Sequence, residues 1–141
     1  MDTIYIYISQ GKYEKAYGLV DNHSYDEIKP LLLNEAYKTE NIGIYSFVNY
    51  LIEQTGNICW IELAIELLLN PLCSIEGAYG VALYHARKLL SVSKSAENYE
   101  RLLFFYELPE TLLERSEALV YATELLELKP GNKIALRVLN E

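Results

Sequence analysis

The strongest constraint on the fold is a series of helix-start and helix-stop signals that divides the chain into short segments of helical periodicity. Asn41 and Asn57 can each cap a helix, and Gly56 can end the first of these. In residues 42–53 the polar side chains lie three and four positions apart, and in 58–69 the clearly polar ones lie one turn apart. Helices with so narrow a polar stripe are nearly surrounded by protein, so we expect these two to be central.

Similar signals outline the other helices. Ser24 and Glu27 form a capping box, and Pro30 predicts either a kink in the helix that follows or a later helix start. We interpret Ile4–Ile8 as a short helix, because no second convincing strand exists to pair with it. The other predicted helical segments are 12–22, 24–39, 74–91, 95 to Pro109, 110–128 as an outer amphipathic helix, and a short one capped by Asn132.

The connections between these segments predict the fold class. Links of two to five residues force neighbouring helices to run antiparallel, so we predict an all-α stack of antiparallel αα-hairpins with about eight or nine helices. A length of 141 residues fits one domain, 1–141.

The charge balance restricts the partners. There are 20 acidic and 12 basic residues, a formal net charge of -8, which argues against direct nucleic-acid binding and favours a basic protein partner or simple solubility. No basic residue lies between Lys38 and Arg87, whereas five glutamates and several aromatic residues do. A second acidic run, from Glu97 to Glu127, has eight glutamates against two arginines.

Two parts of the sequence resemble a known repeat. Gly11, Tyr13 and Ala16 follow the G-x-Y-x-x-A pattern of the tetratricopeptide repeat (TPR), in which the glycine allows a tight turn and the alanine allows close helix approach. Ala118, followed twelve residues later by Pro130, resembles the end of such a repeat. The W-x-x-L-G-x-x-Y half of the motif is absent, so the implied fold is TPR-like.

A second resemblance covers about half of the chain. Residues 70–79, 82–86, 102–106 and 109–110 resemble small helical immunity proteins of bacterial polymorphic toxin systems, including those of contact-dependent growth inhibition. The resemblance implies a cytoplasmic inhibitor that binds the C-terminal domain of a cognate toxin, often a nuclease such as an RNase.

Acidic and aromatic side chains are the candidate contacts with that partner. Nuclease domains are usually basic where they meet phosphate, and Tyr residues suit interface hot spots, so such a surface can occlude the active cleft. The alternative interpretation is structural: the acidic side chains are ordinary solvated surface, and the aromatic rings belong to the core. The candidate toxin-binding residues are Glu62, Glu66, Glu76, Tyr79, Tyr84, Glu97 and Glu100. The alternative function is a TPR-like adaptor that binds a peptide segment of a regulatory or secretion protein.

The sequence contains no recognisable motif for catalysis or for binding a cofactor or a metal ion. We expect no catalytic residue, cofactor or metal site, since Cys59, Cys73 and His85 lack metal-ligand spacing and no phosphate loop is present. Both cysteines are expected to be buried free thiols, and His85 a packed or surface histidine. No signal peptide or membrane span is expected, and we expect a monomer or a weak dimer.

Overall fold

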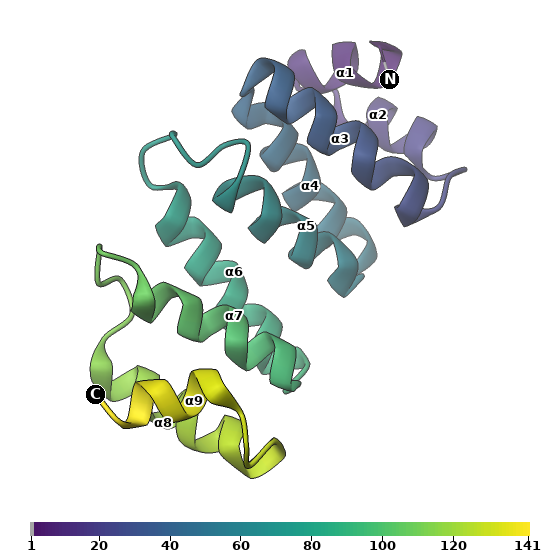
Figure 1. Cartoon of the computed structure of the whole chain (residues 1–141). Helices are drawn as coiled ribbons and strands as arrows, with labels where there is room; N and C mark the ends of the chain where they lie inside the picture. The colour runs from purple at the N-terminus through teal and green to yellow at the C-terminus, as the bar shows by residue number, and fades with distance from the viewer. Residues whose placement is uncertain (1) are drawn as a thin grey trace. The chain divides into compact units, whose positions relative to one another are not determined.

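A computed structural model describes residues 2–141, and in that range it contains nine helices and no strand (Figure 1). The all-α prediction is therefore confirmed, including the helical assignment of Ile4–Ile8. The helices are α1 (Asp2–Ser9), α2 (Tyr13–Val20), α3 (Tyr25–Thr39), α4 (Ile42–Thr55), α5 (Ile58–Leu69), α6 (Ala78–Val92), α7 (Ala96–Glu107), α8 (Arg115–Leu128) and α9 (Lys133–Leu139).

The helices belong to two compact units. Residues up to Ala82 form unit 1 and Leu83–Glu141 form unit 2, so α6 contributes residues to both. In unit 1, α1 packs on α2 and α4 on α5, and α4 also contacts α1, α2 and α3. In unit 2, α8 packs on both α7 and α9. The predicted TPR-like stacking of antiparallel hairpins is confirmed, whereas the single domain, 1–141, stays a prediction.

Local capping signals fix several helix starts as the sequence predicts. The Ser24 hydroxyl accepts a hydrogen bond from the Glu27 amide, and the Glu27 carboxylate accepts one from the Ser24 amide. The side-chain oxygens of Asn41 and Asn57 accept bonds from amides two residues on, at 2.8 and 2.9 Å. Gly56 ends α4 with a φ of 66°, in the left-handed region that favours glycine.

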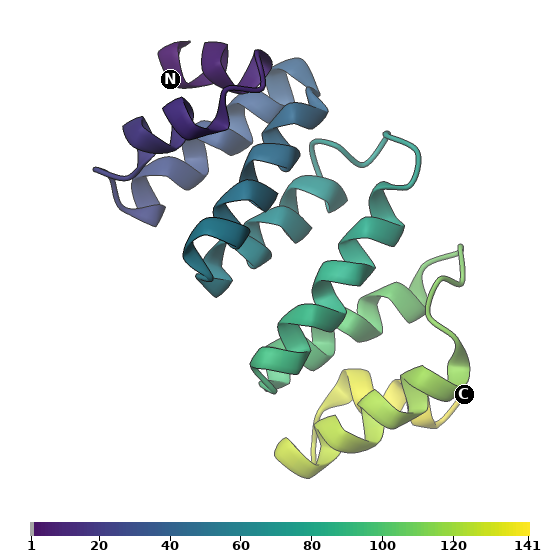
Figure 2. The same cartoon turned by 180° about the vertical axis from the view of Figure 1, so that it is seen from behind.

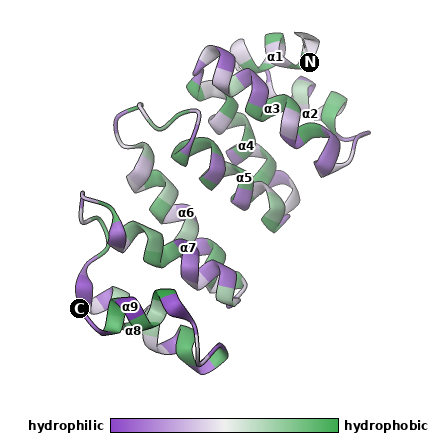
Figure 3. Ribbon diagram, viewed as in Figure 1, coloured by the Kyte–Doolittle hydropathy of each residue, from purple (hydrophilic) through white to green (hydrophobic). Residues whose placement is uncertain are grey.

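The core of unit 1 is centred on α4 and α5, the two helices with the narrowest polar stripes. Phe47 and Leu51 of α4 and Leu63 and Leu67 of α5 are completely buried. Burying one such side chain stabilises the fold by roughly 1.5–3 kcal/mol. The other helices carry hydrophobic and hydrophilic residues side by side, as amphipathic helices do (Figure 3).

Two predicted helix starts are wrong. The helix after Ser74 begins at Ala78, because the Ser74 hydroxyl donates to the Glu40 carboxylate and Gly77 adopts a φ of 85°. The outer helix predicted from residue 110 begins at Arg115, and Leu113 in the preceding segment is completely buried. Pro30 lies inside α3, which begins at Tyr25, so the later-start alternative is also wrong.

The capping box of α3 gives a stability prediction. We expect Ser24→Ala to lower the free energy of unfolding by about 1 kcal/mol, because the Glu27 amide loses its partner. Urea unfolding followed by the fluorescence of Trp60, the single tryptophan, measures this in unit 1. Ser46→Ala, at an exposed position within α4, is the control and should change the value by less than about 0.5 kcal/mol. Equal effects of the two variants would contradict the capping role.

Candidate functional site

The net charge of the chain is unequally divided between the two units. Unit 1 contains eleven acidic and four basic residues, a formal charge of -7. Unit 2 contains nine acidic and eight basic residues, a formal charge of -1. An attraction to a basic partner therefore originates mainly in unit 1.

Unit 2 is close to neutral because it contains four arginines and four lysines. All four arginines of the chain lie in unit 2, and each forms an ion pair with a glutamate of the same unit. The pairs are Arg87 with Glu117, Arg101 with Glu97, Arg115 with Glu141, and Arg137 with Glu107. Three of the eight glutamates in the acidic run from Glu97 to Glu127 are thus paired with guanidinium groups.

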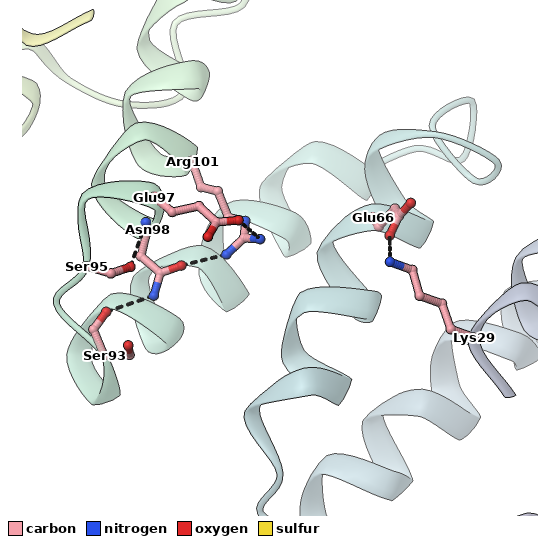
Figure 4. Close-up of polar contacts among 7 residues, drawn as sticks. All are labelled: Lys29, Glu66, Ser93, Ser95, Glu97, Asn98 and Arg101. Carbon is pink, nitrogen blue, oxygen red and sulfur yellow. Dashed lines mark hydrogen bonds and ion pairs between the residues drawn. The ribbon is translucent and has the colours of Figure 1, made fainter. Parts of the chain in front are cut away.

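In unit 1, Glu62 and Glu66 lie on α5 beside α3, and they form with its residues a surface that we call the α3/α5 face. It consists of Tyr25, Lys29, Trp60, Glu62 and Glu66. The Tyr25 ring packs edge-on against Trp60, with centroids 5.0 Å apart. One turn further along α3, the Lys29 Nζ atom lies 3.2 Å from the Glu66 carboxylate (Figure 4).

The environment of Tyr25 shows how the charges of this face are arranged. Burial raises the pKa of the Tyr25 hydroxyl well above its usual value, and the negative fields of Cys59, Glu62, Glu66 and Asp26 raise it further. Two carboxylates of α5 therefore act on a single aromatic position of α3. Trp60 is buried, whereas Glu62 and Glu66 are partly exposed. The face therefore combines a buried aromatic side chain with two accessible carboxylates, which we call its acidic rim.

Glu76 and Tyr79 lie at the other end of unit 1. Glu76 is exposed in the turn before α6, and Tyr79 is half-buried in the first turn of that helix. The same turn carries Cys73, which is exposed, while Cys59 is partly exposed. The prediction that both thiols are buried is therefore wrong, because Cys73 lies on the surface of the turn at 70–77 and Cys59 lies at the partly exposed start of α5.

The three remaining candidates lie in unit 2, in different surroundings. The Tyr84 side chain is 60% exposed on α6. Glu97 pairs with Arg101, which also donates to the buried Asn98 at 2.6 Å (Figure 4). Glu100 accepts a hydrogen bond of 2.8 Å from Asn132, the N-cap of α9. Both glutamates thus take part in internal contacts of unit 2.

Buried Asn98 forms a network that the sequence did not indicate. Its side-chain amide donates to the Ser93 carbonyl at 2.8 Å, and its backbone amide donates to the Ser95 hydroxyl, so it closes the turn between α6 and α7. Glu97 and Arg101 complete this network through the Asn98 carbonyl. The geometry is that of a helix start.

Tyr25, Lys29 and Trp60 are the members of the α3/α5 face that were not among the predicted contacts. The four-residue spacing of Tyr25 and Lys29 is visible in the sequence and places these two on one side of α3. The packing of this side of α3 against α5 is a tertiary contact, and no local sequence signal specifies it.

Within residues 2–141, no group of three or more His, Cys, Asp or Glu side chains is arranged to hold a metal ion. In the same part of the chain, every helix is too short or too polar to cross a membrane.

Comparison with known proteins assigns no family. No family model, curated protein or solved structure matches the chain.

His85 is the one strongly perturbed histidine, and it gives a pH prediction. It is 2% exposed, with its ring edge-on to Tyr84 at 5.2 Å. Burial and, to a smaller extent, the charge of Lys88 lower the pKa of His85 to about 4. Between that value and the usual 6.5, the unfolded chain binds a proton that the folded chain excludes. Stability therefore rises with pH across this window and falls on acidification.

We expect the free energy of unfolding to drop by about 1 kcal/mol between pH 7 and pH 5.5, well above the range in which glutamates titrate. Urea unfolding followed by far-UV circular dichroism at the two pH values measures the drop. His85→Gln should remove most of this difference whatever its effect on stability at pH 7. A variant with the full pH difference would show that another group is responsible.

Proposed function

We propose that the chain is an immunity protein that binds a cognate toxin domain through the α3/α5 face of unit 1 and neutralises it. The observation that carries the proposal is the division of charge, with -7 of the formal charge in unit 1. The toxin domain is a basic nuclease, an RNase in the simplest case, whose phosphate-binding surface becomes covered by this face. The chain acts in the cytoplasm of the cell that it protects.

The electrostatics of the α3/α5 face support rapid and selective association. A basic surface is attracted by the field of unit 1 before contact, which raises the association rate at low salt. At contact, Glu62 and Glu66 pair with lysine or arginine side chains of the toxin. In the free protein the Lys29 Nζ atom lies 3.2 Å from the Glu66 carboxylate, so an incoming cation displaces Lys29 from Glu66.

The packing of the face supports a fixed geometry of binding. The Tyr25 ring is held against buried Trp60, and the two helices that carry the face contact each other directly. Rigid aromatic side chains lose little conformational entropy on binding, which is why such residues are frequent at interface hot spots. The acidic rim around them adds charge complementarity to the same contact.

Unit 2 supports the proposal less directly. Its glutamates at positions 97, 107 and 117 are ion-paired with arginines of the same unit. Exposed pairs of this kind contribute at most about 1 kcal/mol to stability, but they reduce the field that a distant partner experiences. We therefore assign unit 2 no primary role in attracting the toxin.

The function is tested by growth rescue. Expression of a toxin domain encoded directly beside this gene should arrest growth, and co-expression of the chain should restore it. Absence of a toxin gene from that position, or arrest that the chain does not relieve, would contradict the immunity function.

The binding surface is tested separately with two variants of equal net charge. We expect Glu62→Gln with Glu66→Gln to reduce the association rate with the toxin domain about tenfold at low salt, because the rim loses both carboxylates and Lys29 loses its counterion. Stopped-flow mixing at several salt concentrations measures the rate.

The matched control is Glu110→Gln with Glu114→Gln, which removes two exposed carboxylates from unit 2. It should change the association rate less than twofold. Equal reductions in both double variants would assign the attraction to total charge and exclude a specific role for the α3/α5 face.

A further inference from the structure

Unit 1 carries an aromatic cluster on the side opposite to the α3/α5 face. In Figure 1, α3 and α5 lie at the front of unit 1, and the reverse view in Figure 2 brings α2 and α4 to the front. Tyr13 and Tyr17 of α2 meet Phe47 and Tyr50 of α4 along the line where these two helices contact each other. Ring centroids of neighbouring pairs lie 5.6 to 6.3 Å apart.

The cluster has a buried floor and an accessible outer half. Phe47 is completely buried, whereas Tyr13, Tyr17 and Tyr50 are each only partly buried. The Tyr13 hydroxyl donates a hydrogen bond of 3.4 Å to the Gly43 carbonyl, which ties that ring to α4. Tyr17 and Tyr50 meet at an interplanar angle of 76°, so the two rings support each other edge to face.

A carboxylate lies beside these rings. Glu14 is exposed in the first turn of α2. Burial raises the pKa of the Tyr50 hydroxyl, and the charge of Glu14 raises it further, which places the carboxylate within electrostatic range of the ring. The neighbouring base of the same helix, Lys15, lies over the Tyr7 ring of α1 at 5.8 Å from its centroid.

Because Gly18 has no side chain, the surface of α2 next to Tyr17 is bare backbone. It lies one turn beyond Glu14, in the interior of α2, where glycine is among the least favourable residues. A Cβ atom built on Gly18 meets no atom within 4 Å. Neither close packing nor an unusual backbone angle of α2 therefore requires glycine at this position.

We infer that Glu14, Tyr17, Gly18 and Tyr50, the α2/α4 face, dock an arginine-bearing segment of a partner protein. A guanidinium group is planar, stacks on an aromatic ring and pairs with a carboxylate, so it uses both parts of the face at once. The bare surface at Gly18 lets the backbone of the segment approach α2. The formal charge of -7 in unit 1 complements a cationic segment of this kind.

This inference is independent of the proposed toxin binding, because it concerns other residues on the opposite side of unit 1. The probe is an acetylated and amidated alanine hexapeptide that contains two arginines, compared with the same peptide containing two lysines. Titrations followed by amide NMR shifts should show the largest changes in residues 13–20 and 46–54. The arginine peptide should bind about two- to fivefold more tightly than the lysine peptide.

Variants separate the face from general charge attraction. Gly18→Gln places a side chain in open space and should weaken arginine-peptide binding at least as much as replacing arginine by lysine does. Gly80→Gln, at a helical glycine of α6 that also faces open space, is the matched control and should leave binding unchanged. Tyr17→Leu with Tyr50→Leu keeps apolar bulk and should abolish the preference for arginine.

Three results would overturn the inference: equal affinity for the two peptides, shifts centred on α3 and α5, or unchanged binding in Gly18→Gln. Glu62→Gln with Glu66→Gln should leave arginine-peptide binding within about twofold, because those carboxylates lie on the other side of the unit and exposed charges are screened by salt. Loss of toxin binding in that variant, with peptide binding retained, would separate the two faces experimentally.

Discussion

The burial of α4 is the constraint on which unit 1 depends. This helix contacts α1, α2, α3 and α5, and its residues Phe47, Val48 and Leu51 are completely inaccessible. The α3/α5 face exists because α3 and α5 both pack on α4, and the α2/α4 face includes a residue of α4 itself. Cavities in such a core cost several kcal/mol, so the two faces share one source of rigidity.

Unit 2 combines a buried apolar core with ion pairs between its helices. Arg87 of α6 forms two hydrogen bonds with Glu117 of α8, and Arg137 of α9 forms two with Glu107 at the end of α7. Arg115 donates to the Glu141 carbonyl at the start of α8. The four arginines, together with the four lysines of unit 2, leave its acidic composition with a formal charge of only -1.

The sequence predicted those parts of the fold that are encoded within a few residues. The caps at Ser24, Asn41 and Asn57 depend on amides two or three positions away, so their helix starts were predicted correctly. Ser74 failed as a cap because its partner, Glu40, lies 34 residues away.

The same limit applies to the candidate site. The spacing of Glu62 and Glu66 was visible in the sequence, but Lys29 contacts Glu66 only because α3 packs beside α5. Arg101, four residues after Glu97, was a local signal that this carboxylate is paired.

Net charge alone cannot select between the two faces of unit 1, since both belong to the same acidic body. At physiological ionic strength, exposed charges are screened over about 8 Å, so each face acts mainly through its own groups. The α3/α5 face offers two carboxylates, of which Glu66 pairs with Lys29, together with a buried tryptophan. The α2/α4 face offers one carboxylate, accessible rings and bare backbone at Gly18. A high density of positive charge suits the first arrangement, and a flat cation suits the second. This difference in short-range chemistry would allow one acidic unit to distinguish the two basic partners that we propose.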